Sequence, residues 1–182
     1  GEFRNGFDWD IHFTSSEDEG YISQPDTSTQ RFTSAIKGQG GLTGDQTWNL
    51  FNSSANTPSL VDWISTSQET WTNNQLDVLD FVLSGDIKTN ILGNIAMAAG
   101  LQHRKEEFSV TRDKDSRIEF DANGNISKSA DLLFLGGGIE ANSKRDAMAA
   151  FAEFSVPLGD NLLFKTALRY EELEDDNTFD PK

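Results

Sequence analysis

Residues 147–171 read AMAAFAEFSVPLGDNLLFKTALRYE, and this stretch carries the clearest signal of fold class in the chain. Its central Gly159-Asp160-Asn161 segment predicts a tight turn between two strands. A strand is indicated because the side chains after the turn alternate with a period of two between an apolar and a charged face. The apolar face comprises Leu162, Phe164, Thr166, Leu168 and Tyr170, and the other face comprises Leu163, Lys165, Ala167, Arg169 and Glu171. A strand of about ten residues built this way suits a wall between lipid and a polar lumen.

The same alternation recurs earlier in the chain. Phe7, Trp9, Ile11 and Phe13 alternate with polar residues and predict a strand with an aromatic face. Leu76–Ser84 predicts another strand, followed by a turn at Gly85-Asp86. Leu92–Phe108 predicts a third, with Ile95, Met97, Ala99 and Leu101 on one face and Ala96, Ala98, Gly100, Gln102 and Arg104 on the other. With the two limbs of the hairpin, the count is about five strands that run alternately up and down.

Two long polar segments separate these strands. Residues 15–74 and 111–143 are rich in Ser, Thr, Asn, Asp and Gly, and both are predicted to be long extracellular loops. A structureless loop of that length is uncommon inside a compact domain. Helices are expected at Thr29–Ile36 and at Ser59–Ser65, with Ser59 as the N-cap. Within the second loop, Asp121–Asn125 predicts a turn, and Leu132–Ile139 is expected to extend a strand.

Composition narrows the function classes. The 182 residues are 36% hydrophobic, but 13 Phe and 4 Trp in alternating runs argue against a disordered chain. The formal net charge of −15 argues against nucleic-acid binding, which needs a basic surface. No cysteine is present. No signal peptide is recognised, and no run of about eighteen apolar residues predicts a transmembrane helix.

The residues offer little support for catalysis or for metal binding. The acidic runs 17–19 and 171–176 are predicted to be solvated strand ends and loops rather than calcium ligands. Asp121, Asn123 and Asn125 resemble the start of a calcium loop, but Ile126 stands where glycine is needed and Leu132 where a bidentate acid is needed.

Other chemical motifs are also absent from the pattern. His12 and His103 lack metal-ligand spacing and are expected to lie on strand surfaces. Gly136-Gly137-Gly138 lacks the lysine of a phosphate loop. No nucleophile and base stand together. We therefore predict no catalytic residue, no metal, no cofactor and no enzymatic activity.

Aromatic side chains in the first loop are the candidate ligand-binding residues. Trp48, Trp63 and Trp71 fall in residues 15–74, where an exposed indole can stack on a sugar ring or an apolar ligand. The alternative, and for such side chains the commoner role, is packing in a small core of the loop itself. Trp9 is assigned instead to a lipid-facing aromatic girdle.

Several stretches, in this order, resemble the barrel of the TonB-dependent outer-membrane receptors, and the resemblance spans most of the chain. They are FDWDIHFTSS (7–16), DTSTQRFTSAIKGQGG (26–41), LSGDIKTNILGNIAMAAGLQHRKEEF (83–108) and FAEFSVPLGDNLLFKTALRYEELEDDNTFDPK (151–182). The last is similar to a barrel hairpin in which a Phe-Ala-Glu strand closes on a Val-Pro-Leu turn. One departure is WNLFN (48–52), where many relatives carry a cysteine-flanked segment, so any loop disulfide of those relatives is absent here.

The resemblance implies an all-β fold in which residues 1–182 form an antiparallel segment of a transmembrane β-barrel. About five strands of a roughly 22-stranded barrel are expected, which makes the chain part of something larger and its N-terminus not the start of the gene product. The implied location is the outer membrane of a Gram-negative bacterium. The implied partners are outer-membrane lipid, a substrate at the extracellular loops, and a plug domain and TonB complex that lie outside this segment.

The implied function is the energised import of a scarce or large substrate: a siderophore, cobalamin, an oligosaccharide or a peptide. The sequence does not choose among them, although acidic, aromatic loops lean toward neutral or cationic ligands. Two alternatives stay open. One is a soluble, secreted β-sandwich that binds glycans, which would show strands every 8–12 residues. The other is a structural or adhesive surface barrel without transport.

Overall fold

The computed structural model describes residues 1–3, 6–159, 161–174 and 176–182, which divide into two compact units. The first, here called the sheet unit, comprises residues 1–17, 74–107 and 143–182. The second, the loop unit, comprises residues 18–73 and 108–142.

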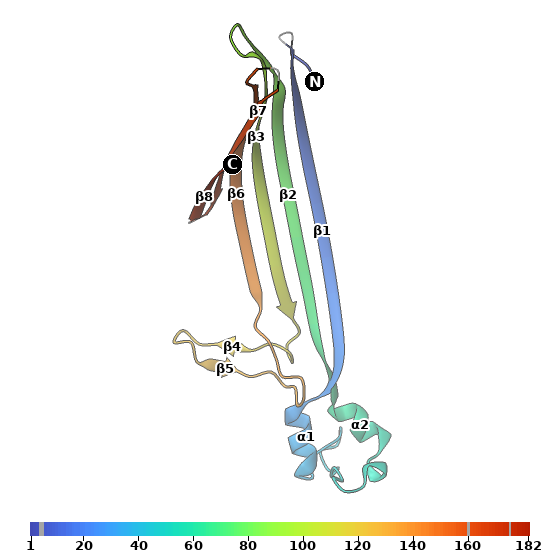
Figure 1. Cartoon of the computed structure of the whole chain (residues 1–182). Helices are drawn as coiled ribbons and strands as arrows, with labels where there is room; N and C mark the ends of the chain where they lie inside the picture. The colour runs from blue at the N-terminus through green and yellow to red at the C-terminus, as the bar shows by residue number, and fades with distance from the viewer. Residues whose placement is uncertain (4–5, 160, 175) are drawn as a thin grey trace. The chain divides into compact units, whose positions relative to one another are not determined.

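The main sheet contains six strands in the order β1-β2-β3-β6-β7-β8 (Figure 1). Within this sheet, each strand lies beside the one that follows it in the sequence. A sheet that follows chain order in this way is an antiparallel meander. The fold is therefore all-β and antiparallel, as the sequence predicts. The six strands are β1 (Phe7–Thr27), β2 (Ser65–Thr89), β3 (Gly93–Arg112), β6 (Ala141–Pro157), β7 (Leu163–Leu173) and β8 (Asp176–Pro181).

Contacts between neighbouring strands of the sheet unit fix which side chains share a face. Between β1 and β2, the Ser15 hydroxyl donates to Asp77 (2.6 Å), and between β2 and β3, Gln102 donates to Asp80 (2.8 Å). Between β3 and β6, the Phe151 ring lies against Gly100, where a Cβ atom would come within 2.3 Å of it. In β6, β7 and β8 the strand register places Ala150, Tyr170 and Phe179 in one row and Phe151, Arg169 and Asp180 in the next.

Strict alternation along each strand then assigns the remaining residues to two faces. One face, here called the apolar face, carries Phe7, Trp9, Ile11, Phe13, Leu79, Phe81, Leu83, Ile95, Met97, Ala99, Leu101, Ala150, Ala152, Phe154, Val156, Phe164, Leu168, Tyr170 and Phe179. Polar residues on the same side are Thr166 within this set and Ser15, Asp77, His103 and Lys105 beyond its end. The opposite polar face carries Asp8, Asp10, His12, Asp80, Gln102, Arg104, Glu106, Arg145, Glu153, Ser155, Lys165, Arg169, Glu171, Asp180 and Lys182, interleaved with small residues and with Val78, Val82, Phe151, Leu163 and Leu173. The faces predicted for β1, β3 and β7 are confirmed.

Nothing in the described sheet unit covers the apolar face. Phe13 is 68% exposed, Leu101 59% and Phe164 53%. The buried apolar residues of this unit are Ala147 and Ala149, which belong to the polar face. This layer therefore has no hydrophobic core of its own among the described residues.

The loop unit, in contrast, builds a small conventional core. Helix α1 (Thr29–Ile36) begins at the N-cap Ser28, and helix α2 (Pro58–Ile64) begins at the N-cap Thr57. The two helices pack together through the buried side chains Ala35, Leu60 and Ile64, with Phe32, Trp48 and Trp63 around them (Figure 1). A short 3₁₀ turn, η1 (Ser53–Ala55), precedes α2. A separate hairpin consists of β4 (Glu119–Phe120) and β5 (Ile126–Lys128).

Several boundaries differ from those predicted from the sequence. β1 continues to Thr27 and β2 begins at Ser65, so only the middle of residues 15–74 is free of long strand. No turn forms at Gly85-Asp86, because β2 continues to Thr89. Residues 132–139 form no strand. β8 was not predicted and follows an acidic run that includes Asp175; Asp175 and Asp160 of the predicted hairpin turn lie outside the described residues.

Both helices were predicted. α1 has the predicted bounds, whereas α2 begins one residue early because Thr57, rather than Ser59, caps it through a hydrogen bond from the Leu60 amide to the Thr57 hydroxyl. The turn at Asp121–Asn125 is also confirmed, since it joins β4 to β5. Among the described residues, no helix is both long and apolar enough to cross a membrane.

Candidate functional site

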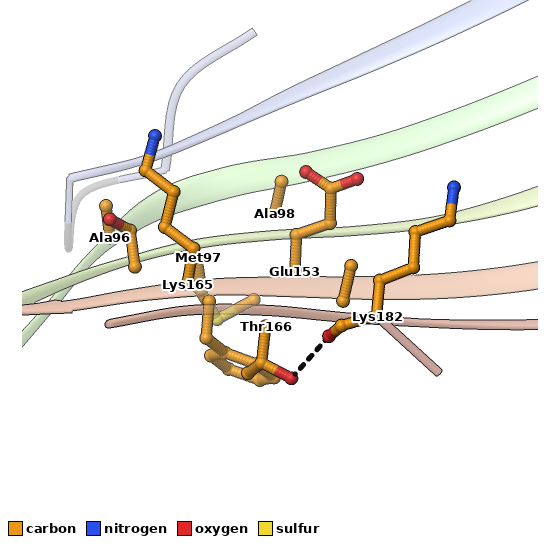
Figure 2. A pocket seen from close by; sticks show the side chains of 10 residues that line it. Ala96, Met97, Ala98, Glu153, Lys165, Thr166 and Lys182 are labelled. Atoms are coloured by element: carbon orange, nitrogen blue, oxygen red, sulfur yellow. Dashed lines mark hydrogen bonds between the residues drawn. The ribbon is translucent and has the colours of Figure 1, made fainter. Parts of the chain in front are cut away.

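The polar face of the sheet unit contains an open depression of about 410 Å³. Its floor is formed by the small residues Ala96, Ala98 and Ala167 of β3 and β7. Figure 2 shows Glu153, Lys165 and Lys182 rising on this side of the sheet, while Met97 and Thr166 project to the other. The Thr166 hydroxyl donates to the Lys182 carbonyl (3.1 Å), which anchors that residue beside β7. Small side chains therefore leave room above the sheet between charged ones.

A row of ion pairs continues the polar face along the same strands. Arg104 lies 2.7 Å from Glu106 and 3.5 Å from Glu171. Glu171 also pairs with Arg169 at 3.2 Å, and Glu106 also pairs with Arg145. The side chains of Arg104 and Glu171 are only 26% and 19% exposed, and β6, which lies between their strands, carries the small residues Ala147 and Ala149. This surface offers charges of both signs to a polar ligand or a polypeptide.

The three tryptophans predicted as ligand contacts do not come together. Trp48 and Trp63 pack against the core of the loop unit, Trp48 with its ring 5.8 Å from that of Phe32. Trp71 lies in β2 rather than in a loop, and its side chain is 40% exposed. Packing thus accounts for Trp48 and Trp63, whereas Trp71 keeps an accessible indole.

A groove of about 300 Å³ in the loop unit surrounds Trp71. The Tyr21 ring of β1 lies beside it, with 5.3 Å between ring centroids and 32° between ring planes. Sequence reasoning missed Tyr21, because fifty residues separate it from Trp71 and its segment lacks an apolar alternation. The remaining side chains on this face of the groove are polar and come from Glu19, Asn73, Ser109 and Thr111. We call this site the aromatic groove.

The other residues singled out in the sequence have structural partners. His12 pairs with Asp10, and His103 lies 3.3 Å from Asp146. The Asp121 carboxylate accepts the amide protons of Asn125 and Asn123 at 2.9 Å each, which lowers the pKa of Asp121 below its ordinary value. No group of three His, Cys, Asp or Glu side chains with metal-site geometry occurs in the part of the chain that the structure describes.

Two carboxylates hold the second loop to the start of α1 within the loop unit. Asp131 accepts hydrogen bonds from the Ser28 hydroxyl and from the Gln30 amide (2.8 Å). Asp26 accepts the amide protons of Leu135 (2.8 Å) and Phe134 (3.1 Å). We call this arrangement the carboxylate clasp.

The carboxylate clasp changes the pKa of Asp26. Burial alone would raise the pKa of Asp26, but backbone amide donors from Leu135, Thr27, Phe134 and Leu133 outweigh it and hold the pKa below its ordinary value. Asp26 is therefore ionised at neutral pH and accepts charge-assisted hydrogen bonds, which are stronger than neutral ones.

The described residues thus present a polar depression, an uncovered apolar face and an aromatic groove. Comparison with protein-family models, with curated proteins and with solved structures finds no match to this chain.

Proposed function

We propose that this chain forms part of the barrel of a TonB-dependent receptor in the outer membrane of a Gram-negative bacterium. The observation that carries the proposal is the two-sided chemistry of the sheet unit. One face is apolar on strand after strand and is covered by nothing, while the other carries ion pairs and small residues. Alternation of this kind is the arrangement of a strand between lipid and an aqueous lumen.

Energetics support lipid as the cover of the apolar face. Removing apolar surface from water stabilises a protein by about 25 cal/mol per Å², so a face with Phe13, Leu101 and Phe164 each more than half exposed forgoes a large stabilisation in water. Exposed apolar patches of more than a few hundred Å² are rare on soluble monomers and mark protein or membrane contacts.

The length of the apolar face on β3 is comparable to, though shorter than, a membrane crossing. On β3, it runs from Ile95 to Leu101 and is followed by His103 and Lys105 on the same side. At about 3.3 Å per residue, such a run extends roughly 20–23 Å along the strand, somewhat less than the apolar band of about 25 Å on outer-membrane barrels, and strand tilt reduces its height further. Strands β1, β2, β3 and β6, with 21, 25, 20 and 17 residues, are longer than a membrane crossing of about 9–11 residues requires, whereas β7 has 11 residues and β8 has 6.

The two edge strands of the sheet are further evidence for the proposal, because they leave backbone groups for additional strands to pair with. β1 and β8 are its outermost strands among the described residues, so each leaves a row of backbone groups without a strand partner. In lipid such groups must be paired, and a barrel does so by closure. We propose that the remaining strands of a roughly 22-stranded barrel complete the pairing.

On this proposal the polar face lines the lumen, which holds a plug domain outside this segment. The extracellular loops capture a substrate too scarce or too large for porins, and the TonB complex drives its release into the periplasm. Siderophores, cobalamin, oligosaccharides and peptides remain the candidate substrates. The role is transport rather than catalysis, with no cofactor.

The soluble β-sandwich gains no support from the geometry. A sandwich covers its apolar face with a second sheet. In the described ranges, the only other sheet is the β4–β5 hairpin, whose strands have 2 and 3 residues.

The test is the mass and location of the native polypeptide that contains this sequence. Membrane and soluble fractions are separated, the membranes are extracted with detergent, and the polypeptide is identified by an antibody to residues 113–131. We expect a membrane species of about four times 20.2 kDa for the barrel and more with a plug domain, because six strands would be about a quarter of a 22-stranded barrel. A species near 20 kDa in the soluble fraction would overturn the proposal.

A further inference from the structure

We propose that the aromatic groove is a binding site for a neutral saccharide. The inference goes beyond the proposed function, because sugar binding at this groove needs neither import nor membrane insertion.

The groove is built from alternate residues of strands. Glu19 and Tyr21 are two apart on β1, Trp71 and Asn73 on β2, and Ser109 and Thr111 on β3. Residues two apart on a strand point to the same face. The intervening Gly20 lies against Thr72, whose hydroxyl oxygen would be 2.4 Å from a Cβ atom at Gly20, so both belong to the opposite face. The groove therefore rests on hydrogen-bonded strands and is preformed.

Its two rings form a stepped platform. With planes 32° apart and centroids 5.3 Å apart, Tyr21 and Trp71 stack partly on each other, and each remains accessible, at 56% and 40% exposure. Such a platform presents ring surface to one side, where the apolar face of a pyranose ring can lie. A cation cage differs, because it surrounds the ligand with ring faces within about 6 Å.

The polar groups around the platform match sugar hydroxyls. Ser109 and Thr111 contribute hydroxyls, Asn73 contributes an amide, and Glu19 contributes a carboxylate that accepts hydrogen bonds. Binding sites for small ligands combine apolar or aromatic walls with a few convergent polar groups, and their volumes begin at about 300 Å³, which is the size of this groove. The single charge on the lining is negative, which disfavours phosphorylated or carboxylated sugars.

The test uses an array of neutral gluco-, galacto- and manno-oligosaccharides with the full chain in a polyoxyethylene detergent, whose headgroup is neither a sugar nor a cation. We expect retention of at least one neutral oligosaccharide, and binding weaker by about tenfold or more in Trp71→Ala and in Tyr21→Ala, since one lost stacking contact is of that order. Trp71→Phe, which keeps a ring, should recover part of the affinity. Circular dichroism of each variant reports whether the sheet still forms.

The matched control is Ile22→Ala, because Ile22 neighbours Tyr21 on β1, is similarly exposed at 58%, and points to the opposite face. It should bind like the native chain. Glu19→Gln separates the ligand classes: neutral sugar binding should survive it, whereas binding of tetramethylammonium should not. The proposal is overturned if no neutral sugar is retained, if Trp71→Ala binds as well as Ile22→Ala, or if tetramethylammonium is the preferred ligand. None of these outcomes bears on the mass and location of the native polypeptide.

Discussion

The two units of this chain differ in how far they bury their apolar side chains. In the loop unit, Leu60 and Ile64 are 2% and 4% exposed, and aromatic rings close over them. In the sheet unit, Leu101 and Phe164 are more than half exposed on a face with no cover. The loop unit is therefore stabilised by burying its own apolar side chains. The sheet unit can gain such stabilisation only from a layer that covers its apolar face.

The largest effect is expected from a substitution that disrupts the core of the loop unit. Leu60→Ala removes a buried side chain between α1 and α2 and should cost about 2–5 kcal/mol of local stability, because the cavity cannot collapse fully. Hydrogen exchange of the α1 and α2 amides measures this loss. Leu42→Ala, at a side chain 93% exposed, is the control and should change local stability by less than about 0.5 kcal/mol. Equal exchange rates in the two variants would show that the core does not stabilise the loop unit.

The next effect sharpens the contrast between the two faces of the sheet unit. Ala98 and Ala99 are consecutive residues of β3, but Ala98 lies on the polar face beside Glu153 and Ala99 lies on the apolar face. If the apolar face meets lipid as proposed, Ala99→Lys should cost about 2–4 kcal/mol of stability in a lipid bilayer and Ala98→Lys much less, because only the first would place a charge in lipid. Urea unfolding from phospholipid vesicles measures both. Similar losses for the pair would argue against a lipid-facing apolar face.

A smaller effect concerns the carboxylate clasp. Asp26→Asn removes charge-assisted hydrogen bonds to the Leu135 and Phe134 amides and should cost about 1–3 kcal/mol. Because the folded-state pKa of Asp26 is lowered, its contribution is fully present above the unfolded value near 3.8 and is lost as pH falls through the folded value.

Acid therefore should loosen residues 131–135 in the native chain. Hydrogen exchange from about pH 6 to about pH 3 measures this, and the Asp26→Asn variant should respond less. Some response persists because the pKa of Asp113 is also lowered: burial opposes the shift, but hydrogen bonds from Ser116 and from neighbouring amides outweigh it. An identical acid response in native and variant chains would show that Asp26 does not hold the loop.

The smallest effect is expected at an exposed ion pair. Lys128 lies 3.3 Å from Glu119 across the β4–β5 hairpin, and both side chains are about two-fifths exposed. Lys128→Ala should change stability by less than about 1 kcal/mol, because water and salt screen such pairs. The same exchange measurement applies, and a loss as large as that of Asp26→Asn would mean that the hairpin is a structural anchor.

Sequence patterns predicted the parts of the fold whose signal is local. The faces of β3 and β7 follow from alternation within each strand, and α1 has the bounds that were predicted for it. The turn at Asp121 follows from the ability of an Asp side chain to accept nearby amide protons, as it does from Asn123 and Asn125.

The sequence pattern did not predict the strand segments in which both faces are polar. Residues 15–27 of β1 and 65–74 of β2 have no apolar side for a period of two to reveal, so they were assigned to a loop. Likewise β8 follows an acidic run, and its partner β7 supplies the hydrogen bonds that make it a strand. Trp71 was identified as a candidate contact, but the platform it forms with Tyr21 was not.

The sequence by itself determined the antiparallel all-β class and the two chemically different faces, since both depend on the order of neighbouring residues. Only the tertiary structure decided how far the strands extend, that the clasp joins Asp26 and Asp131 to distant segments, and that Tyr21 meets Trp71. The physical reason is that these features are made by partners on other strands or loops, roughly fifty to a hundred residues away. Alternation and turn chemistry report only on the residues beside them.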